Sequence, residues 1–180
     1  EFAEANRLYE KGRYAEAATA YQKLVERGEH TAAIYYNLGT AAFKAGQPGR
    51  AIAAYREAEA TFEALGESAV VASLWHQIGM VHASEGNTEA AEQAYKTSLA
   101  LTVAQCDRAG EAQTLHQLGA LCTDQGRLEE AAMLYRQSID IQQTVSDPLG
   151  RSKSFYNLGI VLRKLYRFDE ARDALTAGLA

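Results

Sequence analysis

Apolar residues recur along this chain at spacings of three and four positions, with polar residues between them. This spacing gathers the apolar side chains on one face of a helix, whereas a half-buried strand would alternate them every second position. The clearest stretch has Trp75 and Ile78 before Gly86. Ala91 and Tyr95 continue the pattern after it. We therefore expect two antiparallel amphipathic helices joined by a turn at Gly86, and no strands.

The same helix pair is repeated along the chain. Alanine marks the second helix of each copy at intervals of 34, 40, 40 and 40 residues: Ala17, Ala51, Ala91, Ala131 and Ala171. A tyrosine stands four residues after each of the first four: Tyr21, Tyr55, Tyr95 and Tyr135. A repeat of this length predicts stacked helix pairs, because each pair buries its apolar face only against its neighbours. We expect a surface, not a catalytic pocket, to carry the function.

Two sets of glycines punctuate the repeat. One set follows the first helix and is expected to end it in the left-handed conformation: Gly12, Gly46, Gly86 and Gly126. The other lies in the middle of the first helix: Gly39, Gly79, Gly119 and Gly159. A glycine there costs about 1 kcal/mol relative to alanine, which indicates a close helix contact. We expect Ala91 to be the small partner in its copy, and Tyr95 to pack its ring into the next repeat.

These residues resemble the tetratricopeptide repeat (TPR), whose pattern is Trp-x2-Leu-Gly-x2-Tyr followed by Ala-x3-Phe. Residues 75–95 match it closely, and the second, fourth and fifth copies keep the leucine, glycine and alanine positions. The ends depart from the pattern, with Ala5 at the glycine position of the first copy and Tyr166 at the turn glycine of the last. The resemblance covers the whole chain. It implies an all-α fold, a right-handed α-solenoid (superhelix) of about five antiparallel helix pairs.

We expect residues 1–180 to form a single TPR solenoid domain. The repeats are predicted at about 1–31, 32–66, 67–106, 107–146 and 147–180. The chain begins without an initiator Met, inside a predicted helix, so we expect it to be a fragment of a longer chain.

The family's usual period is 34 residues, so the period of 40 requires longer helices. Asp107 and Asp147 are suited to cap the helices that begin these longer repeats, and Pro148 is suited to a first helical position. The chain is similar to the forty-residue subclass found in spindle-orientation scaffolds and in bacterial regulators with repeat-rich sensor regions. That resemblance implies an extended peptide or a partner domain bound in the concave groove.

A carboxamide precedes each Leu-Gly or equivalent pair: Asn37, Gln77, Gln117 and Asn157. In a stack of this kind the position tends to face the groove, where an amide can hydrogen-bond a peptide backbone whatever its side chains. A ring precedes each amide: Tyr36, His76, His116 and Tyr156. Rings bring contact area with little rotamer entropy, which favours a peptide-binding wall. The alternatives are that the amides bridge neighbouring helices and that the rings shield helix faces.

The net charge of −5 is unevenly distributed, because residues 151–180 hold six basic and three acidic residues. Lys153, Arg163 and Lys164 are therefore expected to meet carboxylates of an acidic partner near the C-terminal repeat, the alternative being a solvated charged face. An acidic body argues against nucleic-acid binding. The sequence has no membrane-length apolar run and no disulfide framework, so we expect no membrane association and a cytoplasmic location.

Candidate chemistry is lacking. The histidines are not spaced for a shared metal, neither cysteine has a CxxC partner, and no nucleotide-binding or nucleophile motif occurs. We expect no enzyme activity, cofactor or metal. His76 and His116, at equivalent positions, form the one pair that could reach a common ion, but a groove wall explains the same residues. A carboxylate clamp for chaperone tails is excluded, because Phe2, Ser73 and Gln77 stand where its cations belong.

The sequence thus predicts a scaffold or adaptor for protein–protein interaction, holding an extended partner segment in the groove between residues 33 and 164. Two alternatives remain open. The chain is either a sensor or regulatory arm of a larger regulator, including a transcriptional one, or a module that forms a homo-oligomer through its terminal repeat. Leu175 and Leu179 motivate the last reading, because the open end of a solenoid needs a cover.

Overall fold

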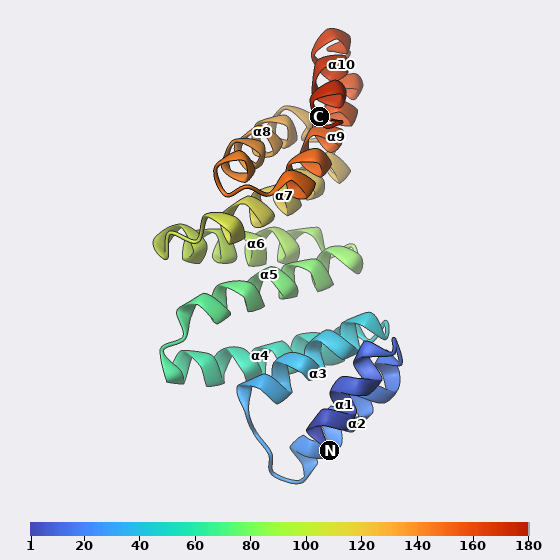
Figure 1. Cartoon of the computed structure of the whole chain (residues 1–180), viewed down its shortest axis with the longest axis vertical. Helices are drawn as coiled ribbons and strands as arrows, with labels where there is room; N and C mark the ends of the chain where they lie inside the picture. Colours follow the sequence, from blue (N-terminus) through green and yellow to red (C-terminus); the bar gives the residue numbers. More distant parts are fainter. Residues whose placement is uncertain (180) are drawn as a thin grey trace. The chain divides into compact units, whose positions relative to one another are not determined.

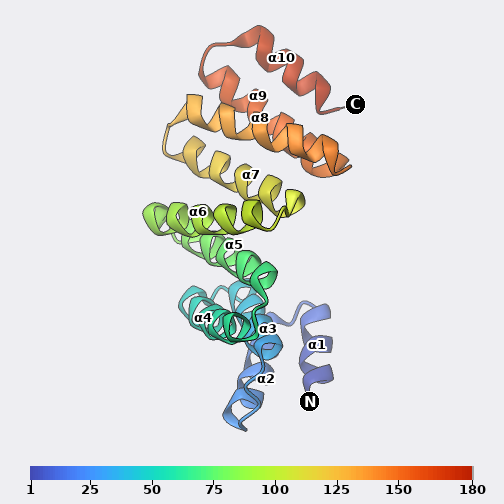
Figure 2. The ribbon, with the colours of Figure 1, turned by 90° about the vertical axis from the view of Figure 1, so that its left-hand side faces the viewer.

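The computed structural model describes residues 1–179, apart from the side chain of Ser68. Over this part of the chain the backbone forms ten α-helices and no strand, which confirms the all-α class. Figure 1 and Figure 2 show successive helices joined by short connections. The helices are α1 (Phe2–Glu10), α2 (Tyr14–Glu26), α3 (Ala32–Lys44), α4 (Pro48–Leu65), α5 (Ser68–Ser84), α6 (Thr88–Ala104), α7 (Arg108–Asp124), α8 (Leu128–Thr144), α9 (Pro148–Lys164) and α10 (Phe168–Ala177).

The chain divides into two compact units, Glu1–Ala94 and Tyr95–Ala180, and the boundary falls inside α6. In the first unit, each of α1 to α4 packs against the next helix in sequence. In the second unit, α7 to α10 do the same. Each unit has its own core, which includes the buried ring of Tyr55 in the first and that of Tyr135 in the second. Each unit is therefore built of stacked helices of the solenoid type, while the finer division into five repeats stays a prediction.

The predicted turn glycines end the first helix of their pairs. Gly46 has a φ of 70°, and its N–H donates to Phe43 O at 3.0 Å, while Gln47 N–H donates to Ala42 O at 2.9 Å. A residue without Cβ adopts this left-handed conformation without strain. Tyr166 takes the same conformation with a φ of 60° in the last copy, where the sequence has no glycine.

The mid-helix glycines make the close contacts that the sequence predicted, but with a different partner. A Cβ at Gly39 would lie 2.6 Å from ring carbons of Tyr55, and one at Gly119 would lie 3.0 Å from the ring of Tyr135. The tyrosine ring, not the alanine, therefore lies against the glycine of its own copy. The glycine leaves room for the ring inside the pair, and the expectation that the ring packs into the next repeat stays a prediction.

Two of the later helices begin with the predicted caps. The Asp107 carboxylate accepts from Gly110 N–H at 3.0 Å, and the Asp147 carboxylate accepts from Gly150 N–H at 2.9 Å. Pro148 occupies the first turn of α9. These contacts satisfy backbone N–H groups that have no partner inside the helix, so they define where α7 and α9 begin.

Candidate functional site

A hollow of about 400 Å³ opens on the first unit, where α1, α2 and α3 meet. We call it the tyrosine hollow and define it by its lining residues: Asn6, Tyr9, Glu10, Tyr21, Tyr36, Asn37 and Thr40. Two of the predicted groove residues, Tyr36 and Asn37, belong to it. Three phenol rings, two carboxamides, a hydroxyl and a carboxylate thus share one concave surface.

Hydrogen bonds hold the polar groups of the tyrosine hollow in place. The Tyr21 hydroxyl donates to Asn6 Oδ1 at 2.5 Å, which ties α2 to α1. Burial raises the pKa of Tyr21, and a hydrogen bond with the Asn37 side chain works against that rise. Thr40 accepts from the Tyr55 hydroxyl at 3.2 Å, and burial raises the pKa of Tyr55 to about 12. These phenols therefore remain neutral at physiological pH.

Two of the rings that line the hollow contact aromatic rings that lie outside it. The ring of Tyr9 meets that of Tyr14 edge-on with centroids 5.2 Å apart, and Tyr36 lies 6.1 Å from Tyr55. Contacts of this geometry are favourable for aromatic pairs. Tyr9 and Tyr36, two of the three rings that line the hollow, are therefore held by contacts with neighbouring rings.

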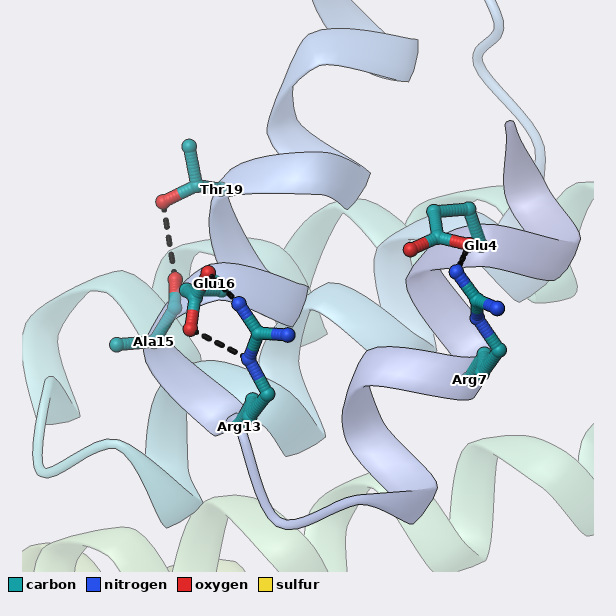
Figure 3. A network of polar contacts seen from close by, with 6 residues as sticks. All are labelled: Glu4, Arg7, Arg13, Ala15, Glu16 and Thr19. Atoms are coloured by element: carbon teal, nitrogen blue, oxygen red, sulfur yellow. Dashed lines mark hydrogen bonds and ion pairs between the residues drawn. The ribbon is translucent and has the colours of Figure 1, made fainter.

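The arginines of α1 and its neighbouring turn are engaged with carboxylates (Figure 3). Arg7 lies 2.6 Å from Glu4, and Arg13 Nε donates to Glu16 Oε1 at 2.7 Å. In each of these pairs a side-chain hydrogen bond from the arginine lowers the pKa of the glutamate. The pairs are exposed, so each contributes little to stability, but they engage Arg7 and Arg13, the arginines on either side of Tyr9 and Glu10 in sequence.

The other predicted groove residues of the first unit, His76 and Gln77, are half-buried on α5 and do not line the tyrosine hollow. Burial lowers the pKa of His76. Trp75, which precedes them, carries the guanidinium of Arg56 over its ring at 4.2 Å from the centroid. This cation–π contact joins α4 to α5 and covers the indole from one side.

In the second unit, His116 of α7 is the centre of a polar network that joins three helices. Its Nδ1 lies 2.8 Å from Ser154 Oγ, and its Nε2 lies 3.4 Å from Asn157 Nδ2. Because an amide NH₂ can only donate, Nε2 is the acceptor and Nδ1 carries the proton. Ser154 Oγ lies 3.4 Å from Ser138 Oγ, which donates to Ala112 O at 2.8 Å.

Burial, and then the positive charge of Lys153, lower the pKa of His116. The ring is therefore neutral at physiological pH and meets Tyr135 edge-on, with centroids 5.4 Å apart. The Asn157 side chain also hydrogen-bonds Tyr135, whose pKa is raised mainly by burial. Two predicted groove residues, His116 and Asn157, are thus brought together, and both take part in contacts between helices.

The remaining predicted residues are spread over α7 and α9. Gln117 is half-buried on α7, while Lys153, Tyr156, Arg163 and Lys164 are exposed on α9. Asn37 and Asn157 each hydrogen-bond a buried tyrosine from the preceding helix, Tyr21 and Tyr135. The bridging role left open from the sequence is therefore present for these two amides, and their use in binding stays a prediction.

Sequence reasoning missed Tyr9 and Glu10 as candidate site residues. Both lie near the end of α1, in the copy that departs most from the repeat pattern. Comparison with the other copies therefore gave them no counterpart. The available signal was local, namely Tyr9 and Glu10 placed one turn after Asn6 on the same helix.

The described part of the chain has neither a metal-ligand cluster nor a membrane-spanning helix. No group of three or more His, Cys, Asp or Glu residues among residues 1–179 could hold a metal ion. None of the described helices is long and apolar enough to cross a lipid bilayer.

Comparisons with known proteins address the fold. The solved structure of BtubC (BKLC) from P. vanneervenii is 20% identical with a TM-score of 0.84, covering 97% of this chain and 75% of BtubC. TPR-like repeats of a putative kinesin light chain from Podosopora anserina are 18% identical with a TM-score of 0.78, covering 98% and 90%. The apo form of the quorum sensor NprR from B. thuringiensis is 19% identical with a TM-score of 0.81, covering 98% of this chain and 51% of NprR. These likenesses show the fold.

The sequence itself gives the family. No curated protein matches it. Two family profiles described as tetratricopeptide repeat match residues 2–69 and residues 70–144. Together they cover most of the chain, and the matched ranges include Leu38-Gly39, Leu118-Gly119 and the Ala-x3-Tyr sequences that follow them. The chain belongs to the tetratricopeptide repeat family.

Proposed function

We propose that this chain is a protein–protein interaction module that binds an extended segment of a partner on the first helices of its repeats. The observation that carries the proposal is the tyrosine hollow, a concave surface with rings and carboxamides side by side. Membership of the TPR family supports binding of proteins in general. The hollow supports an extended segment in particular, because amides offer donors and acceptors to a peptide backbone.

The two kinds of residue have separate roles in this proposal. Carboxamides grip the main chain of the partner regardless of its sequence, and rings supply contact area. Asn37 uses one hydrogen bond on Tyr21, and an amide group has further donor and acceptor positions for a ligand. At α9, the exposed Lys153, Arg163 and Lys164 are proposed to meet acidic residues of the partner.

The test is selection of peptides from a random library on the immobilised chain, followed by measurement of their affinities. The variant Asn37→Ala with Asn157→Ala is expected to weaken the selected peptides about tenfold, because each alanine removes hydrogen bonds to the peptide backbone. Gln22→Ala with Gln137→Ala is the matched control, since it removes two carboxamides from second helices α2 and α8. Circular dichroism checks that both variants keep their helix content. Unchanged affinity in the folded test variant would remove the amides from the proposal.

A second candidate is a sensor or regulatory arm of a larger regulator. The similarity to NprR, which is named a quorum sensor, favours it, because this chain spans about half the length of that protein. The two candidate functions differ in whether a further domain is required. An interaction module binds its partner as this chain alone, whereas a regulatory arm changes the activity of a further domain when it binds a ligand.

A further inference from the structure

We infer that the tyrosine hollow takes a guanidinium group, so that the partner segment carries an arginine side chain at this point. This inference rests on the proposed function and adds the chemistry of one ligand residue to it. The juxtaposition that carries it is Glu10 beside three phenol rings and two carboxamides on one concave surface.

The charge of the tyrosine hollow is negative. Of the described residues that line it, Glu10 alone is charged, and no lysine or arginine is among them. Glu10 lines the hollow, and its charge adds to the raised pKa of Tyr21, after burial and Tyr9. Arg7 and Arg13, the arginines on either side in sequence, are engaged with Glu4 and Glu16. Lys11, next to Glu10 in sequence, is exposed and is not among the residues that line the hollow. An anionic ligand would be repelled here, and a cation would be attracted.

The rings of the tyrosine hollow suit the same ligand. Burial raises the pKa of Tyr9, and the phenols of Tyr14 and Tyr36 add to the effect, so these oxygen-bearing groups lie near one another. Aromatic faces carry negative charge density and attract a cation placed over them. Tyr21 is only 2% exposed, so the half-buried rings of Tyr9 and Tyr36 are the ones that act in the same direction as the carboxylate.

A guanidinium fits this set of groups better than an ammonium. It is planar, stacks on aromatic faces and presents five N–H donors in a fixed fork, whereas an ammonium is a compact and strongly hydrated charge. The acceptors available are the Glu10 carboxylate and the side-chain carbonyls of Asn6 and Asn37. The Asn6 carbonyl accepts from Tyr21 and has a second lone pair. A volume of about 400 Å³ admits an arginine side chain and part of its backbone.

Short capped peptides test the hollow. The probe is acetyl-Gly-Arg-Gly-amide, and its control carries citrulline, which has the shape of arginine without the charge. Binding is followed by NMR on the tyrosine ring signals of the full chain. The arginine peptide is expected to bind at least about fivefold more tightly than the citrulline peptide, and added salt is expected to reduce the difference. Equal binding by the two would overturn the inference, and so would tighter binding of a lysine peptide.

Two variants test whether the preference for arginine arises at Glu10. Glu10→Gln is expected to weaken the arginine peptide by about fivefold and to leave the citrulline peptide unchanged. Glu26→Gln removes an exposed carboxylate from the end of α2, outside the hollow, and is expected to change neither. Glu10 is itself exposed, so its replacement spares the core. Loss of affinity in both variants alike would assign the attraction to the net charge of the chain and would overturn a site at Glu10.

The two proposals can fail separately. The arginine peptide could bind as described while the affinity of the library peptides does not depend on Asn37 and Asn157. That result would support the guanidinium site and contradict the extended groove. Conversely, the affinity of the library peptides could depend on these amides while neither the selected peptides nor the arginine probe shows a preference for arginine. That result would support the groove and overturn the guanidinium site.

Discussion

Single residues decide how closely the two helices of a pair approach. Gly39 of α3 leaves room for the ring of Tyr55, which is fully buried, and Gly119 does the same for Tyr135. In the last copy Leu175 takes the place of the tyrosine and lies against Gly159. The contact therefore requires a glycine on one helix and a large side chain on the other, and aromatic character is dispensable at the end of the chain.

Replacement of Gly39 by alanine is expected to lower the free energy of unfolding. The new methyl group would lie 2.6 Å from the ring of Tyr55, and overpacking of this kind costs about 1–3 kcal/mol. Alanine regains about 1 kcal/mol of helix propensity, so the net effect is a loss of up to about 2 kcal/mol. Urea unfolding measures it.

Gly49→Ala is the matched control, because it lies in the first turn of α4 with no atom within 4 Å of the added methyl group. It is expected to be neutral or slightly stabilising. A Gly39→Ala protein as stable as the Gly49→Ala protein would contradict the role given to the ring.

At the scale of the helix, side-chain caps begin some of the described helices and not others: Thr31 caps α3, and aspartates cap α7 and α9. Asp107 and Asp147 accept from the backbone of Gly110 and Gly150, whereas Arg127 stands at the start of α8 without a side-chain cap bond. In both caps the glycine three residues on leaves room for the carboxylate. The pattern Asp-x-x-Gly therefore marks helix starts in the second unit.

Asp107→Ala is expected to lower the free energy of unfolding by about 1 kcal/mol, through loss of the bond to Gly110 N–H and of a negative charge at a helix N-terminus. Hydrogen exchange should show faster exchange in the first turn of α7. Arg127→Ala serves as the comparison, because that position makes no cap bond. If exchange at Gly110 stays slow in Asp107→Ala, the cap does not hold the helix start.

The helices, their turns and these caps were predictable because each depends on residues close in sequence. The glycine at position 46 and the aspartate at position 107 act within a few residues of themselves. The side chain that lies against Gly39 could not be predicted from the sequence, because spacing alone does not tell whether the alanine or the tyrosine of α4 faces the glycine. The tyrosine hollow was predicted only in part, since Tyr9 and Glu10 lie in the copy where the repeat pattern gives no guide.

At the scale of the whole molecule, stability depends on buried groups that must stay neutral. Burial lowers the pKa of His76 and of His116, one in each unit. Unfolding exposes both rings to water, where their pKa returns to about 6.5. Below that pH these two histidines bind protons in the unfolded chain but remain neutral in the folded chain, so the free energy of unfolding decreases as the pH falls.

The thermal midpoint is therefore expected to fall between pH 7.5 and pH 5.5, above the range in which the exposed glutamates titrate. His116→Gln should reduce this fall, although the variant is also less stable at pH 7.5 because it loses the bond to Ser154. Gln117→Ala, the neighbouring position on α7, removes no titrating group and is the control that should leave the pH dependence unchanged. If the thermal midpoint of His116→Gln decreases with pH as much as that of the unchanged protein, the His116 ring does not couple stability to pH.

The fit between a mid-helix glycine and the large side chain sixteen residues later, as in Gly39 and Tyr55, is complete within one helix pair. Duplication of such a pair copies both halves of the contact at once, and deletion removes both. Unequal recombination between copies can then lengthen or shorten the chain in whole repeats without leaving a ring unmatched. An insertion of one residue between the two halves would misplace the ring. A helix pair is thus a unit that can be gained or lost whole, and a change in the number of pairs alters the length of the stack without rebuilding its core.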